Sequence, residues 1–90
     1  MGYDVELTES AADTLDEMWA RDAASAEVIE GILDELEATG TARRERAYLV
    51  QSATVARMAT RPTHNGLAAV IWHRNGRQVV VHAVRVREAP

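Results

Sequence analysis

The 90-residue chain has no cysteine, no lysine and no phenylalanine, and it contains only two prolines and four aromatic residues. The absence of cysteine excludes disulfides, thiolate nucleophiles and cysteine-ligated zinc sites. No apolar run approaches the length of a membrane span, and the N-terminus lacks the order of basic, apolar and small residues that marks a signal peptide. We therefore expect a cytoplasmic protein without a membrane partner.

Charge is divided unevenly between the two halves of the chain. Residues 1–45 carry thirteen acidic side chains and three arginines, whereas residues 46–90 carry seven arginines and the single acid Glu88. The net charge of −4 therefore hides about −10 followed by about +6. The exclusive use of arginine reflects either a compositional bias or the bidentate fit of guanidinium to phosphate. This division predicts that one face of the protein attracts anions.

The N-terminal segment shows a strand pattern followed by a helix pattern. Residues from Tyr3 to Leu7 alternate between apolar and acidic, which predicts a short strand with one buried face. Ser10 followed by Asp13 resembles a capping box, and apolar residues then recur at helical spacing. These features predict a first helix that ends at about Asp22.

A second helix is expected between Ser25, as its N-cap, and Gly40, as its C-terminal stop. Its apolar residues lie on one stripe, and its acidic residues cover the other side. The pattern then weakens over residues 41–51, which fit either a loop or a short strand.

Three strands are predicted in the C-terminal half, over residues 54–60, 67–73 and 78–87. Turn-forming residues fill positions 61–66, and Asn75-Gly76 is a strong hairpin signal. We therefore predict one α+β domain in which an N-terminal strand and two helices join a small antiparallel sheet with a C-terminal three-stranded meander. The helices are expected to pack on one face of this sheet.

Strand alternation divides the meander residues between two faces. The face predicted to lie under the helices holds Ala56, Met58, Ala68, Val70, Trp72, Val80, His82, Val84 and Val86. The opposite face is predicted to hold Val55, Arg57, Ala59, Arg61, Leu67, Ala69, Ile71, His73, Val79, Val81, Ala83, Arg85 and Arg87. Several arginines would thus converge on the open face. The core prediction also includes Met18 and Trp19 of the first helix.

Several segments accompany this order of elements: Tyr3-Asp4-Val5-Glu6-Leu7-Thr8 at the start, Gly66 and Val70-Ile71-Trp72 later, and the run from Val79 to Glu88. Together they resemble the RelE/ParE superfamily of toxins. The resemblance implies one of two activities, ribosome-dependent cleavage of mRNA or inhibition of DNA gyrase. It also implies a cognate antitoxin whose chain wraps around the toxin.

The resemblance assigns phosphate-binding roles to two arginines. Arg57 falls where the family places a basic residue on the second strand, and Arg87 matches the arginine that closes the last strand. Two further basic positions of the family fall at Ala59 and Ala69, where no cation is present. The alanine pair Ala68-Ala69 is either a natural loss or an inactivating substitution. Arg61 and Arg85 are expected to support binding of RNA or of an acidic antitoxin segment.

The three histidines have different predicted roles. His73 follows Trp72 on the predicted open face and is the candidate acid or base; the alternative is an exposed residue at a strand end. His64 lies in a turn, and His82 is expected to be a hydrogen-bonded core residue among valines. No two histidines have the spacing typical of metal ligands, so we predict neither a metal site nor a cofactor.

Two functions therefore remain open from the sequence. The first is a metal-independent endoribonuclease that uses Arg57, Arg87 and His73, supported by Arg61 and Arg85. The second is a non-catalytic binding protein, either a gyrase inhibitor or an attenuated toxin homologue. The alanines at 59 and 69 and the acidic helices favour the second function, whereas Arg57, Arg87 and the basic sheet face favour the first.

Overall fold

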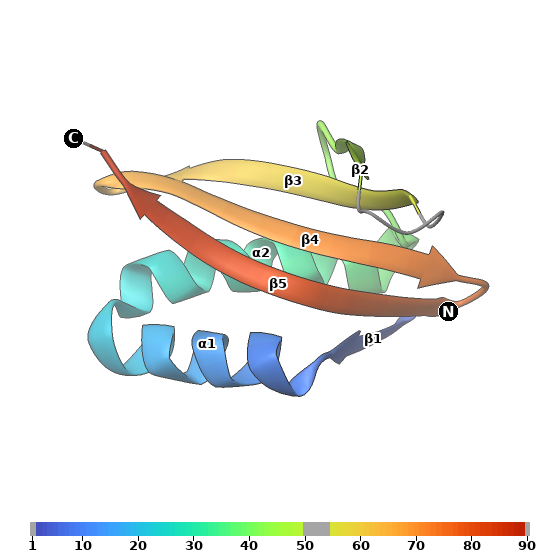
Figure 1. Ribbon diagram of the computed structural model, residues 1–90, viewed down its shortest axis with the longest axis horizontal. Coiled ribbons are helices and arrows are strands. Elements are labelled where there is room, and N and C mark those ends of the chain that lie inside the picture. Colours follow the sequence, from blue (N-terminus) through green and yellow to red (C-terminus); the bar gives the residue numbers. More distant parts are fainter. Residues whose placement is uncertain (1, 50–54, 90) are drawn as a thin grey trace.

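The computed structural model of the protein describes residues 2–49 and 55–89, which form a two-layer α+β fold (Figure 1). The elements follow the chain as β1 (Asp4–Leu7), α1 (Glu9–Arg21), α2 (Ala23–Thr39), β2 (Arg46–Leu49), β3 (Val55–Thr63), β4 (Gly66–Asn75) and β5 (Gln78–Glu88). The strands form one sheet in the order β1-β5-β4-β3-β2. The predicted helices and C-terminal meander are therefore confirmed, while Thr54, the first residue of the strand predicted over residues 54–60, lies outside the described residues.

The sheet is mixed rather than wholly antiparallel, so the prediction was wrong at one edge. Strand β1 pairs with β5 in parallel, from Asp4 opposite Gln78 to Leu7 opposite Val81. The other neighbouring strands are antiparallel. Alternation within a strand reports which face is buried, but it carries no information about the direction of the neighbouring strand.

Both helices begin earlier than their predicted caps. The Oγ1 atom of Thr8 accepts a hydrogen bond from the Ala11 amide at 3.2 Å, so Thr8 is the N-cap of α1 and Ser10 already belongs to its first turn. Asp22 caps α2 by accepting from the Ser25 amide at 3.2 Å, while Ser25 itself is buried within the helix. Each prediction chose a good capping residue two or three positions too late. The predicted end of α2 is confirmed, because Gly40 adopts the left-handed conformation at φ 73°.

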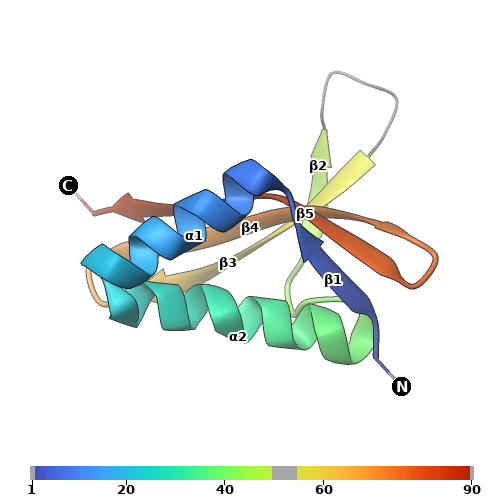
Figure 2. The same ribbon diagram turned by 90° about the horizontal axis from the view of Figure 1, so that it is seen from below.

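The two helices cover the same face of the sheet, as Figure 2 shows from the helical side. The core between the layers is formed by buried apolar residues of both helices and of the strands: Ala11, Leu15, Ala26, Ile29, Ile32, Leu33, Leu36, Ala42, Ala59, Ala68, Val70, Trp72, Val79, Val81 and Val84. Trp72 is buried as predicted, with 1% of its surface exposed. Trp19, by contrast, is 40% exposed, so its predicted place in the core was wrong.

Strand β3 is turned over relative to the prediction. Arg57, Ala59 and Arg61 lie opposite Trp72, Val70 and Ala68 of β4, whose side chains belong to the helical side. Met58 pairs instead with Ile71 and lies on the open face. Ala56 and Ala59 are both small, apolar and buried, so composition alone gave no strong contrast between the two faces of β3.

A β-bulge in β5 explains the second difference between predicted and observed faces. Ile71 lies opposite Ala83, but the next residue, Trp72, lies opposite Val81, so His82 is an extra residue in the ladder. After the bulge, Val84 and Val86 lie on the helical side as predicted. Before the bulge, Val79 and Val81 are buried, whereas the prediction placed Val80 and His82 in the core. His82 is exposed, and its predicted place in the core was wrong.

Candidate functional site

The open face of the sheet carries a groove of about 400 Å³. Its lining residues come from the four strands β2 to β5 and combine apolar side chains with three arginines: Arg46, Tyr48, Met58, Thr60, Leu67, Ala69, Ile71, Arg85 and Arg87. Figure 1 shows both helices on one side of the sheet, and the lining residues of the groove project from the other side. This is the part of the open face that can hold a ligand with both apolar and anionic groups.

Strand register brings these side chains together in rows across the sheet. Thr60, Ala69 and Arg85 are consecutive partners on β3, β4 and β5. One row further along, Leu67 lies opposite Arg87. Residues that face each other on neighbouring strands project from the same side of the sheet, which places Arg85 and Arg87 beside an apolar surface.

The groove is electropositive. No lining residue is acidic, and Arg46, Arg85 and Arg87 are exposed. Among the ion pairs formed by residues 2–49 and 55–89, none involves these three arginines. Guanidinium groups without a protein carboxylate are suited to bind an external carboxylate or phosphate.

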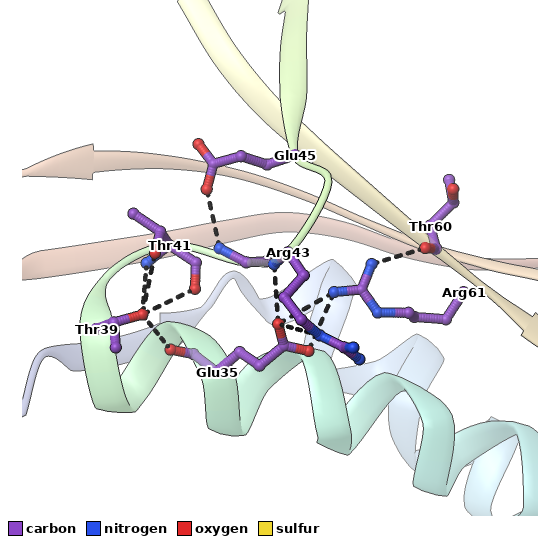
Figure 3. Close-up of polar contacts among 8 residues, drawn as sticks. Glu35, Thr39, Thr41, Arg43, Glu45, Thr60 and Arg61 are labelled. Carbon is purple, nitrogen blue, oxygen red and sulfur yellow. Dashed lines mark hydrogen bonds and ion pairs between the residues drawn. The ribbon is translucent and has the colours of Figure 1, made fainter.

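Arg61, one of the predicted binding residues, is committed to a structural role instead. Its Nη2 atom lies 3.1 Å from both carboxylate oxygens of Glu35, and its Nη1 donates to the Thr60 carbonyl at 2.8 Å (Figure 3). The Arg61 side chain is only 14% exposed. The Arg43 amide also donates to Glu35 at 2.9 Å, so one carboxylate joins α2, β3 and the loop before β2.

Arg57 also lies away from the groove, on the helical side of β3. Its Nε atom is 3.6 Å from a carboxylate oxygen of Glu45, and the two residues line a smaller pocket together with Gly40, Trp72 and Arg74. The predicted set therefore separates into two groups. Arg85 and Arg87 share the groove, whereas Arg57 and Arg61 face the other side of the sheet.

His73 lies on the open face, two residues beyond Ile71, so it is next to the groove rather than among its lining residues. Its Nδ1 atom lies 2.5 Å from Nε2 of His82, and the two rings are stacked with centroids 4.7 Å apart. Partial burial of its ring lowers the pKa of His82, and the positive charge that His73 acquires on protonation lowers it further. The third histidine, His64, instead contacts both carboxylate oxygens of Asp22 at 3.0 Å.

The two groove residues on β2 were not among the predicted site residues. Arg46 and Tyr48 lie on β2, the segment in which the sequence pattern was weakest. Their alternation in the run Arg46-Ala47-Tyr48-Leu49 was an available signal for a strand with one functional face. This alternation was too short to predict a strand, because β2 spans four residues.

Comparison with known proteins found no matching family model, no matching curated protein and no matching solved structure. Within the described residues, no helix is both long and apolar enough to cross a membrane. The groove and its neighbouring side chains are therefore the basis for assigning a function.

Proposed function

We propose that the protein is the toxin of a type II toxin–antitoxin pair, that it acts on mRNA at the ribosome, and that the open-face groove binds the RNA. The observation that supports this proposal is the presence of three exposed arginines and one tyrosine around an apolar groove in which no described lining residue carries a carboxylate. Phosphates attract the arginines, and an unstacked base can pack on the phenol ring and the apolar side chains. The proposal retains Arg87 and Arg85 from the sequence analysis and adds Arg46 and Tyr48.

Cleavage through a 2′-hydroxyl requires stabilisation of the charge that develops on the phosphorane and a route for proton transfer. Arg85 and Arg87 supply the first requirement in this proposal. Tyr48 and Thr60 carry the hydroxyl groups of the groove, and His73 is the nearest histidine along β4. Arg57 and Arg61 are assigned no contact with RNA, because both are paired with glutamates on the helical side.

A non-catalytic binding protein is the second candidate, including a gyrase inhibitor or an attenuated toxin homologue. The observation that favours it is Ala69, a small uncharged side chain that lies within the groove and opposite Arg85. In this alternative the same arginines bind an acidic antitoxin segment, because carboxylates and phosphates present similar acceptor geometry to guanidinium.

The test is expression of the chain from a tightly repressed promoter while incorporation of labelled amino acids and thymidine is followed. We expect amino-acid incorporation to fall first and Arg87→Ala to reduce mRNA cleavage by about 10²–10³-fold, the usual effect of removing one charge-stabilising donor. Arg21→Gln is the matched control, because Arg21 is exposed on α1, away from the groove, and pairs with Glu17 at 3.5 Å.

The two candidates differ in the outcomes that they require. Early loss of thymidine incorporation would support gyrase inhibition and contradict the ribonuclease. Absence of toxicity in both the wild type and Ala69→Arg would support the binding protein. Unchanged cleavage by a folded Arg87→Ala variant would remove the groove from the proposed mechanism.

A further inference from the structure

The histidine pair on the open face is a cluster of nitrogen ligands outside the groove. His73 on β4 and His82 on β5 are nine residues apart in sequence, but their Nδ1 and Nε2 atoms lie 2.5 Å apart. His82 is exposed and His73 is partly exposed, so solvent and small ions have access to both rings. Two imidazole nitrogens this close together can share a proton or, once the rings have moved apart, hold a metal ion between them.

The β-bulge is the feature that creates this pair. In a regular strand, residues two positions apart share a face, so the buried Val84 would place His82 on the helical side as well. Here Ala83 pairs with Ile71 and Val81 pairs with Trp72, so His82 is left outside the regular pairing of β4 and β5, beside His73. Bulges commonly re-aim one side chain in this way.

We propose that His73 and His82 bind one divalent transition-metal ion through Nδ1 and Nε2, respectively, with water in the remaining coordination positions. Neutral imidazole favours zinc, nickel and copper, whereas magnesium and calcium require oxygen ligands. No group of three histidine, cysteine, aspartate or glutamate side chains with suitable geometry is present among residues 2–49 and 55–89. The site therefore has two protein ligands, and copper is expected to bind most tightly.

The geometry needs only a small adjustment to accept the ion. Two nitrogens bound to one tetrahedral zinc are roughly 3.3 Å apart, which requires the rings to separate by about 1 Å. The ring planes are 23° apart, and the two histidines stand on neighbouring antiparallel strands. Because His82 is exposed and His73 is partly exposed, rotation about their side-chain bonds can provide this separation.

The position of the site suggests what the bound ion does to the fold. It joins β4 to β5 at the point where the bulge interrupts their pairing. A ligand that binds the folded chain but not the unfolded chain raises stability by mass action, so the metal should raise the midpoint of thermal unfolding. This inference does not depend on the proposed RNA-binding function.

The test is calorimetric titration of the full chain with Zn²⁺, Ni²⁺ and Cu²⁺, with Mg²⁺ as the negative control. We expect one equivalent of each transition metal to bind, and His73→Gln and His82→Gln to weaken binding by about tenfold or more. His64→Gln is the matched control, because His64 is an exposed histidine that contacts Asp22. This control should keep the affinity of the wild type.

A nitrogen-15 NMR experiment on the wild type tests the named atoms without any substitution. Zinc should shift the resonances of His73 Nδ1 and His82 Nε2, while those of His64 remain unchanged. Equal zinc affinity in the wild type and in folded His73→Gln and His82→Gln variants would overturn the proposal. Shifts confined to His64, or no shift at any histidine, would do the same and leave the pair as a hydrogen bond only.

Discussion

At the scale of single residues, Glu35 pairs with two arginines that differ in burial, Arg61 and Arg43. Burial opposes ionisation of Glu35, but hydrogen bonds from the Arg43 amide and the Arg61 guanidinium outweigh that effect and lower the pKa of its carboxyl group. The two arginines differ in exposure, since the side chain of Arg61 is 14% exposed and that of Arg43 is 80% exposed. The same carboxylate thus allows a direct comparison.

Replacement of Arg61 by alanine is expected to lower the free energy of unfolding by about 1–3 kcal/mol, because it removes the charged partner of a mostly covered carboxylate. Replacement of Arg43 by alanine should cost less than about 1 kcal/mol, since its exposed ion pair is screened and its backbone amide still donates to Glu35. Urea denaturation of both variants measures the difference. Equal losses would contradict the structural role assigned to Arg61.

Asp22 links the N-terminus of α2 to the β3–β4 turn. Hydrogen bonds from Ser25, followed by the contact with His64, lower the pKa of the Asp22 carboxyl group. A carboxyl group whose pKa is lower in the folded state adds stability above its unfolded pKa of about 3.9 and loses that contribution as the pH falls through the folded pKa.

The Asp22→Asn variant should therefore unfold more easily than the wild type at neutral pH, and the difference should shrink as the pH falls below about 4. Asparagine retains the oxygen that caps the helix but removes the charge and the second oxygen, which accepts from the Ser25 hydroxyl at 2.6 Å; the dependence of the difference on pH reports the charge. Urea denaturation at several pH values gives the measurement. A difference that is constant from pH 7 to pH 2 would exclude this contribution of the charge.

At the scale of elements, the bulge in β5 decides which valines reach the core. Val81 and Val84 are both buried, although a regular strand places residues three positions apart on opposite faces. The extra residue His82 allows both to face the helices. If His82 is removed, Val81, Ala83 and Val84 follow one another in regular alternation, and both valines still face the helices.

Deletion of His82 is therefore expected to leave the chain folded. Deletion of Val80 instead moves Val79, which is fully buried, towards the open face and should cost at least about 1.5–3 kcal/mol. Circular dichroism and urea denaturation of the two single-residue deletions provide a matched comparison. If the His82 deletion is the more damaging of the two, His82 is not the inserted residue of the ladder.

At the scale of the whole molecule, the charge asymmetry of the chain becomes an asymmetry between two layers. The helices carry most of the acidic residues, while the groove on the opposite side carries Arg46, Arg85 and Arg87. A polyanion is repelled by the first layer and attracted by the second, so it should approach through the sheet. Salt weakens both effects, with a Debye length of about 8 Å at physiological ionic strength.

Binding of a short single-stranded RNA is expected to depend on salt with a slope of about −2 in a plot of log affinity against log salt concentration. Each phosphate neutralised contributes about −0.7 to this slope, and the groove offers three arginines. Arg46→Ala, Arg85→Ala and Arg87→Ala should each reduce the slope by about 0.7, whereas Arg21→Gln should leave it unchanged. Fluorescence anisotropy at several salt concentrations tests this, and an unchanged slope in all three groove variants would contradict RNA binding in the groove.

Helical and strand periodicities predicted the type of every element except β2, whose segment fitted either a loop or a short strand, because only the other patterns extended over enough residues. The sequence also predicted the hairpin at Asn75-Gly76, where Gly76 adopts φ 62°, and the glycine stop of α2 at Gly40. Local chemistry decides such features, since a turn or cap needs a residue that tolerates positive φ. The charge division and the burial of Trp72 were equally visible before the fold was known.

Which arginines lie together depends on strand pairing and on the packing of the sheet against the helices. Alternation predicts two faces but not which of them meets the helices, and β3 has buried alanines on both. The inserted residue His82 reverses the faces of the β5 residues that precede it, and it lies against His73. The parallel direction of β1 follows from its pairing with β5. These outcomes depend on pairing between residues distant in sequence, and one extra residue changes the face of every side chain beyond it.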